Sequence, residues 1–286
     1  MTYATLISAA ELAAHAGDAN LLIVDCRHDL ANPAAGLDAY RAGHIPNARF
    51  AHLDQILSGA KTGSDGKFKG RHPLPERHDF IDAMRVIGVN ANTQVVAYDA
   101  HGGMFAARLW WLLRWVGHVQ VAVLDGGLQA WQAQGGAVTA EMPAATRGDL
   151  QEQPSLVTTI DAEGVLDNLD SKTMTVVDAR AADRYRGENE TLDALGGHIP
   201  GAKNRFFKDN LAADGSFKSP ATLRAEWNAV IDNPQTAIMQ CGSGVTACHN
   251  LLALEVAGLP GAKLYPGSWS EWSSDSTRPV ATGPQP

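Results

Sequence analysis

The chain repeats itself at the scale of a whole domain. The segment LLIVDCR at 21–27 recurs as MTVVDAR at 174–180, and VLDGGLQAW at 123–131 recurs as LYPGSWSEW at 264–272. In both copies a GHIP turn follows the first of these segments. A repeat this long is the duplication of a complete domain and excludes a solenoid of short repeats. The fold of one half therefore predicts the fold of the other.

Each copy alternates short β-branched runs with helical patterns. In the first copy, for example, the apolar run at 93–98 is followed by a helical pattern at 105–115. This alternation predicts βαβ units around a mostly parallel sheet. We expect an α/β protein with two tandem domains, 1–138 and 157–286, each a mostly parallel sheet flanked by helices. The Ala- and Pro-rich segment 139–156 between them is expected to be a linker.

Cys241 marks the point where a strand turns into a helix. The apolar run TAIMQ ends at Gln240, and CGSGVTA leads into a segment whose leucines recur at helical spacing. The free N–H groups at a helix N-terminus favour an anion, and Gly242 and Gly244 let successive N–H groups turn toward the sulfur. This arrangement favours the thiolate, the nucleophilic form of cysteine. We therefore predict that Cys241 is the catalytic nucleophile.

The matching position in the first copy is Asp99. This half cannot perform thiol chemistry there, so we expect a non-catalytic domain that covers the active half, with the site in the cleft between them. Cys26, at a strand end, and Cys248, inside the helix pattern, are predicted to be small core residues. The three cysteines form no CxxC pair, so neither a disulfide framework nor a thiolate zinc site is expected.

Other function classes fit the sequence poorly. Cysteine phosphatases use a similar loop but place an arginine six residues after the cysteine, where this chain has Ala247. A net charge of −8 argues against nucleic acid or an anionic membrane as the main partner. No secretory signal pattern and no apolar run of membrane-spanning length is found, which favours a reducing cytoplasm. We expect no cofactor and no metal.

Three motifs together resemble a known family. The loop CGSGVTA in the second half, GHIPG after a VVDAR strand, and YPGSWSEW near the C-terminal end are similar to the two-domain rhodanese superfamily of sulfurtransferases. The loop is most similar to the 3-mercaptopyruvate sulfurtransferases, because the thiosulfate enzymes carry basic residues directly after the cysteine. The resemblance implies transfer of a sulfane sulfur from 3-mercaptopyruvate, through a Cys241 persulfide, to cyanide or to a thiol such as that of thioredoxin.

Two alternatives remain open at this point. The first is a thiosulfate sulfurtransferase with the same nucleophile. The second is a persulfide carrier protein, which would accept one sulfur and stop in the absence of its partner.

The resemblance also implies roles for individual residues. Asp54 in HLDQ and His72 in RHPLP correspond to an Asp and a His of the first domain that act with Ser243 in proton transfer. Arg184 corresponds to the arginine that binds the substrate carboxylate. Further substrate contacts are expected from the loop residues Gly242, Gly244, Val245 and Thr246.

Some positions depart from the family pattern and concern the identity of the donor. Asp193 stands near the place of a second arginine, for which Arg186 is an alternative. His28 stands where relatives often carry a tryptophan. The basic loop 63–73 is expected to be a solvated surface turn.

Residues kept by both copies are predicted to maintain the fold, because one copy lacks the nucleophile. They are His44, His198, Asp25, Arg27, Asp178 and Arg180. Three tryptophans on one helical pattern are expected in the core or at a domain interface, namely Trp110, Trp111 and Trp115.

Overall fold

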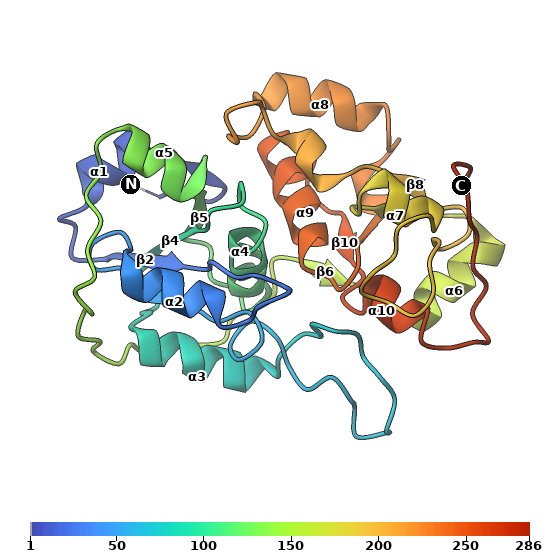
Figure 1. The fold of residues 1–286 in the computed structure, drawn as a ribbon, viewed down its shortest axis with the longest axis horizontal. Coiled ribbons are helices and arrows are strands. Elements are labelled where there is room, and N and C mark those ends of the chain that lie inside the picture. Colours follow the sequence, from blue (N-terminus) through green and yellow to red (C-terminus); the bar gives the residue numbers. More distant parts are fainter. Residues whose placement is uncertain (1) are drawn as a thin grey trace. The chain divides into compact units, whose positions relative to one another are not determined.

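The computed structural model describes residues 2–286, which divide into two compact units (Figure 1). Each unit includes a short segment from the other half of the sequence, since 60–74 packs with the second unit and 212–217 with the first. Unit 1 comprises the chain up to Gly59, Pro75–Leu156 and Ala212–Phe217, and unit 2 comprises Ala60–Leu74, Val157–Leu211 and Lys218–Pro286.

Unit 1 is built on a five-stranded parallel sheet in the order β1-β5-β4-β2-β3. The central strands are almost wholly apolar because both faces of a parallel sheet are covered. Their register places Ile23 opposite Val96, which in turn lies opposite Ala122. The strands are β1 (Leu6–Ile7), β2 (Leu21–Asp25), β3 (Arg49–Phe50), β4 (Gln94–Tyr98) and β5 (Val121–Leu124).

The helices of unit 1 follow local sequence signals. Ser8 begins α1 with a capping box, in which its hydroxyl accepts from the Glu11 N–H and the Glu11 carboxylate accepts from the Ser8 N–H. Helix α4 is buried along most of its length, and Trp110 and Trp111 lie in the core while Trp115 is half-buried. The helices are α1 (Ala9–His15), α2 (Ala35–Ala42), α3 (Arg77–Ile87), α4 (Ala106–Trp115) and α5 (Gly127–Ala133).

Unit 2 repeats this architecture. Its parallel sheet has the order β6-β10-β9-β7-β8, which is the order of unit 1 with each strand replaced by its counterpart. The predicted fold, two mostly parallel sheets flanked by helices, is therefore confirmed. The strands are β6 (Thr158–Thr159), β7 (Thr175–Asp178), β8 (Lys203–Asn204), β9 (Ala237–Gln240) and β10 (Lys263–Leu264).

The helices of unit 2 include one that lies in the core. Helix α9 is buried from Thr246 to Leu254, so its N-terminus is held in place by packing on all sides. Along residues 2–286, no helix combines the length and apolar character needed to cross a membrane. The helices are α6 (Ala162–Ser171), α7 (Ala182–Arg186), α8 (Pro220–Asn228), α9 (Thr246–Val256) and α10 (Ser268–Trp272), with 3₁₀ turns η1 (Phe207–Asn210) and η2 (Pro234–Thr236).

The residues that both copies share hold equivalent turns. At the end of β2 the Arg27 guanidinium binds the buried Asp25 carboxylate, with Nη2 to Oδ2 at 2.7 Å. At the end of β7 Arg180 binds Asp178 in the same way, at 2.6 Å. Each arginine also donates to the carbonyl of the glycine in its GHIP turn. The prediction that these four residues maintain the fold is confirmed.

The two GHIP histidines are likewise structural. The ring of His44 stacks on Tyr40 and its Nδ1 lies 2.7 Å from the Tyr40 carbonyl oxygen. His198 stacks on Tyr185 and its Nδ1 lies 2.9 Å from the Tyr185 carbonyl oxygen. Both pairs are buried, which explains why the turn is kept in the copy that lacks a nucleophile.

The segment 139–156 contains no helix or strand and is hydrogen-bonded to unit 1. The N–H of Gly148 donates to the Arg85 carbonyl at 2.8 Å, and that of Gln153 to the Val116 carbonyl at 2.9 Å. The Leu150 side chain is buried. The segment therefore follows the surface of unit 1 along a defined path.

Candidate active site

Cys241 lies in the loop between β9 and α9, where the sequence predicts it. The residue is 2% exposed. The N–H of Ser243 donates a hydrogen bond to the sulfur of Cys241, with 3.4 Å between N and Sγ. The backbone of Cys241 is held by the first two residues of α10, because its N–H donates to Ser268 Oγ at 3.1 Å and its carbonyl accepts from the Trp269 N–H at 3.0 Å. The sulfur is therefore fixed in position before any substrate binds.

Two glycines lie in this loop, and one of them is required by its backbone. Gly244 has a φ of +77°, and a Cβ there would collide with the carbonyl oxygen of Pro266, at 2.3 Å. A Cβ on Gly242 would lie 2.8 Å from Nη2 of Arg71. A side chain at Gly242 would therefore have to displace only the flexible end of Arg71.

The corresponding loop of unit 1 is filled by a carboxylate. Asp99 follows β4 and is fully buried. Its Oδ1 accepts from the N–H groups of His101 and Gly103, at 2.7 and 3.0 Å, and its Oδ2 from those of Phe105 and Ala106, at 2.7 and 2.9 Å. Because four N–H groups converge on one carboxylate, this loop geometry is an anion-binding cradle.

His72 and Ser243 meet within unit 2. Nδ1 of His72 lies 2.7 Å from Oγ of Ser243, and both side chains are less than a tenth exposed. The segment 60–74 that carries His72 belongs to unit 2 by its contacts, although its place in the chain is within the first copy. A histidine bonded to a serine hydroxyl can move a proton to or from a group at the sulfur.

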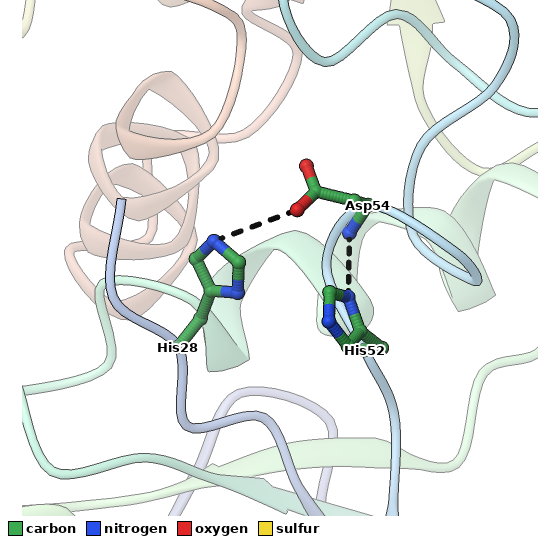
Figure 2. A group of neighbouring side chains, drawn as sticks. All are labelled: His28, His52 and Asp54. Carbon is green, nitrogen blue, oxygen red and sulfur yellow. Dashed lines mark hydrogen bonds and ion pairs between the residues drawn. The ribbon is translucent and has the colours of Figure 1, made fainter. Parts of the chain in front are cut away.

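Asp54 lies in unit 1, beside two histidines (Figure 2). Its Oδ2 is 3.9 Å from Nε2 of His28, and its N–H donates to Nδ1 of His52 at 3.1 Å. Burial lowers the pKa of His28 below its ordinary value even though Asp54 acts in the opposite direction. The expectation that Asp54 acts with His72 stays a prediction.

These three residues are also the candidate metal ligands. One ligand atom from each of His28, His52 and Asp54 lies within 4.8 Å of the others. Nδ1 of His52 accepts the Asp54 N–H, so the neutral ring carries its proton on Nε2. A cation bound through Nε2 would have to displace that proton. The expectation that no metal is needed stays a prediction.

Arg184 reaches the loop from α7. A Cβ on Gly242 would lie 3.6 Å from both of its terminal nitrogens. Its guanidinium is held by Glu190, with Nη2 to Oε1 at 2.8 Å. Burial raises the pKa of Glu190, but the hydrogen bonds and charge of Arg184, together with the backbone N–H groups of Leu192 and Asp193, hold the pKa below its ordinary value. Arg186, the alternative second arginine, pairs instead with the exposed Glu188.

Sequence reasoning missed Arg71. The loop that contains it was expected to be a solvated turn, yet its guanidinium lies next to Gly242 and forms an ion pair with Asp193. The side chains of Arg71 and Asp193 are 22% and 7% exposed. The available signal was the position of Arg71 directly before His72, since one folded segment would bring both to the same place.

The two remaining cysteines are buried in the core, as predicted, and none of the three, all within the described residues, forms a disulfide. Cys26 lies beside Asp25 and Asp99, and burial followed by these carboxylates raises its pKa well above the ordinary value. Cys248 donates to the Gly244 carbonyl oxygen, with Sγ to O at 3.3 Å. Cys26 is therefore a poor nucleophile, and Cys248 supports the loop from within α9.

Comparison with known proteins agrees with this architecture. The model of the rhodanese-like domain matches twice, at residues 8–134 and 161–275. The chain belongs to the rhodanese-like domain family. The two matches correspond to the two copies, and only the second contains a cysteine at the loop position, Cys241.

Several members of the family are similar over most of their length. A protein of Pseudomonas aeruginosa described as "Probable 3-mercaptopyruvate sulfurtransferase" is 44% identical over 286 residues, which is 99% of this chain and 100% of the relative. The thiosulfate sulfurtransferase of Bos taurus is 38% identical over 243 residues, 82% of this chain and 78% of the relative. The structure of 3-mercaptopyruvate sulfurtransferase from Leishmania major superposes with a TM-score of 0.84 at 30% identity, covering 96% of this chain and 76% of that one.

Proposed function

We propose that this protein is a sulfurtransferase that moves a sulfane sulfur from 3-mercaptopyruvate, through a persulfide on Cys241, to a thiol or to cyanide. The observation that carries the proposal is a cysteine at the N-terminus of a buried helix, in a loop whose counterpart binds a carboxylate. The full-length similarity to the Pseudomonas aeruginosa protein supports the choice of donor.

In the first half-reaction the Cys241 thiolate attacks the sulfur of mercaptopyruvate. A sulfur–sulfur bond forms, the carbon–sulfur bond breaks, and its electron pair stays on the carbon as the enolate of pyruvate. That carbon then takes a proton, for which the Ser243 hydroxyl, bonded to His72, is the proposed source. The products are pyruvate and the Cys241 persulfide. The proton of the donor's thiol, now on the outer sulfur of the persulfide, is lost to solvent.

In the second half-reaction the acceptor attacks the outer sulfur of the persulfide. The sulfur–sulfur bond breaks and its electron pair returns to Cys241 as the thiolate. A thiol acceptor, such as that of thioredoxin, leaves as its own persulfide, and cyanide leaves as thiocyanate. No further oxidant or reductant is required. In the first half-reaction the carbon that loses the sulfur keeps the electron pair and is reduced, which brings the sulfur to the sulfane level, and in the second half-reaction the sulfur passes to the acceptor at that level.

The bound Asp99 carboxylate of unit 1 has the same reach from the backbone as a persulfide on Cys241. An Asp side chain and a cysteine persulfide both place a charged atom two bonds beyond Cβ. In unit 1 the Asp99 oxygens accept four backbone N–H groups. We propose that the equivalent N–H groups of unit 2, in the loop that includes Val245 and Thr246, bind the outer sulfur of the persulfide in the same way.

Thiosulfate is the second candidate donor. A specific observation favours it, since Arg71 brings positive charge to the residue after the nucleophile, where the loop sequence has none. Asp193 neutralises that charge, which favours the monoanion mercaptopyruvate over the dianion. We therefore expect kcat/KM to be higher with mercaptopyruvate than with thiosulfate.

Steady-state rates with the two donors test this proposal. Arg184→Ala should raise KM for mercaptopyruvate by about 10- to 100-fold, because one charge-assisted clamp is lost. Ser243→Ala should mainly lower kcat, by about 10- to 100-fold, because a proton donor is lost. A higher kcat/KM with thiosulfate would assign the protein to the second candidate. A single burst of pyruvate without turnover in excess acceptor would identify a carrier protein.

We propose a reducing cytoplasm as the place of action, where thiol acceptors are abundant.

A further inference from the structure

Two guanidinium groups converge on the residue that follows the nucleophile. The terminal nitrogens of Arg71 and Arg184 lie at 2.8 and 3.6 Å from the position of a Cβ on Gly242. One arrives from the segment 60–74 and the other from α7. Both side chains are about a fifth exposed, so their remaining N–H groups are accessible to a small anion.

The position of Arg71 is fixed by its backbone. Its N–H donates to Oγ of Ser270 at 3.0 Å. The N–H of the same serine donates to the Gly242 carbonyl at 2.9 Å. A single residue of α10 therefore holds the backbone of Arg71 and the backbone of the nucleophile loop together. This link keeps the backbone of Arg71 beside the nucleophile loop, and the ion pair with Asp193 holds the guanidinium.

Arg71 ends a chain of alternating charges. Asp193 pairs with Arg71, and its Oδ2, which has no hydrogen-bond partner among the described residues, lies 3.7 Å from Nη2 of Arg184. Three carboxylates and three guanidiniums follow one another in the order Asp178, Arg180, Glu190, Arg184, Asp193 and Arg71. The formal charges of this chain cancel. It offers directed N–H donors at Gly242 without an excess of positive charge.

We infer that Arg71 is a second anion-binding residue for the sulfur donor, and that Asp193 positions it and neutralises it so that a monoanionic 2-oxo acid is preferred to dianionic thiosulfate. This inference rests on the proposed function of Cys241. A guanidinium binds a carboxylate with two parallel hydrogen bonds. A dianion would meet the Cys241 thiolate with no net positive charge to offset the repulsion.

Arg71→Ala tests the binding role. KM for mercaptopyruvate should rise by about 10- to 100-fold while kcat changes by less than about threefold. Arg71→Lys should show a smaller rise, because the charge is kept and the fork of donors is lost. The matched control is Arg186→Ala, which removes a partly exposed arginine of the same unit that is paired with the exposed Glu188. We expect the control to change KM by less than about twofold.

The role of Asp193 is tested by comparing kcat/KM for the two donors. Asp193→Asn keeps the shape and an oxygen for Arg71 but removes the charge. The ratio of kcat/KM for mercaptopyruvate to that for thiosulfate should fall by about tenfold, in favour of thiosulfate. A role in stability alone would lower both values equally and leave the ratio unchanged.

The reversed pair, Arg71→Asp with Asp193→Arg, separates a binding effect from misfolding. It should restore KM for mercaptopyruvate to within about tenfold of wild type, because a guanidinium returns beside Arg184. If Arg71→Ala matches the Arg186→Ala control, the inference is wrong and the proposed function stands. If wild-type protein forms no persulfide on Cys241 from mercaptopyruvate by mass spectrometry, the proposed function is wrong and the inference falls with it.

Discussion

The two copies contain the same strand, loop and helix, and they differ in the group that fills the loop. In unit 1 the Asp99 carboxylate accepts four backbone N–H groups. In unit 2 the Cys241 sulfur accepts one, from Ser243. The carboxylate is a permanent anion that satisfies the loop, whereas the thiolate is one bond shorter and can be extended by a sulfur. One residue therefore decides whether the cradle is structural or reactive.

The charged groups near the cysteines of the two units also differ. Burial, together with the neighbouring carboxylates of Asp25 and Asp99, raises the pKa of Cys26 in unit 1. In unit 2 Arg180 lies near Cys241, and Arg71 and Arg184 flank the next residue, each paired with a carboxylate. Carboxylates thus lie beside the thiol of unit 1, whereas charge-balanced ion pairs surround the loop of unit 2.

The largest expected effect comes from removing the sulfur that distinguishes the loops. Cys241→Ser should lower sulfur transfer by about 10⁴-fold or more, because a hydroxyl cannot form a persulfide. Thermal unfolding should be unchanged, since the hydroxyl is close in size to the thiol. Pyruvate release and persulfide mass are the measurements. Residual turnover near the wild-type rate would place the nucleophile elsewhere.

Removing Asp99, the residue of unit 1 that corresponds to Cys241, should lower the stability of the protein. Asp99→Ala leaves several N–H groups without an acceptor and should lower the free energy of unfolding by about 3 kcal/mol. Equilibrium urea unfolding measures this loss. Folded Asp99→Ala protein should keep kcat within about threefold of wild type. Loss of sulfur transfer at unchanged stability would contradict the structural role of Asp99.

The smallest effects are expected at the other thiols. Cys26→Ser and Cys248→Ser should keep transfer within about twofold, because neither sulfur takes part in the reaction. Alkylation followed by mass spectrometry should label Cys241 first and Cys26 last, since burial and the nearby carboxylates disfavour the thiolate of Cys26. An inactive Cys248→Ser variant of normal stability would show that the nucleophile had been assigned to the wrong sulfur.

Much of the fold could be predicted because its signals are local. The repeated VVDAR-type strand ends and GHIP turns identified the duplication, and the structure shows the same strand order in both sheets. The glycines of the nucleophile loop predicted a tight turn, which the positive φ of Gly244 confirms. Local periodicity was not sufficient for the segment 139–156, whose hydrogen bonds to unit 1 depend on groups far away in the chain.

The site was predicted less completely, because its charges come from separate segments. Cys241 and Ser243 are neighbours in one loop and were found from their spacing. Arg71 was missed because its environment depends on the packing of segment 60–74 with unit 2. Asp193 was noted as a departure, but its pairing with Arg71 spans 122 positions and has no signature in the sequence.

The sequence by itself determined the duplicated α/β fold, the position of Cys241, the proposed nucleophile, and the inability of Asp99 to replace it. These follow from hydrophobic periodicity, glycine placement and side-chain chemistry, which act over a few residues. Only the tertiary structure decided which guanidiniums lie at the loop and which carboxylates neutralise them. Coulomb interactions depend on distance in space, and residues far apart in the chain become neighbours only when the sheets and loops pack.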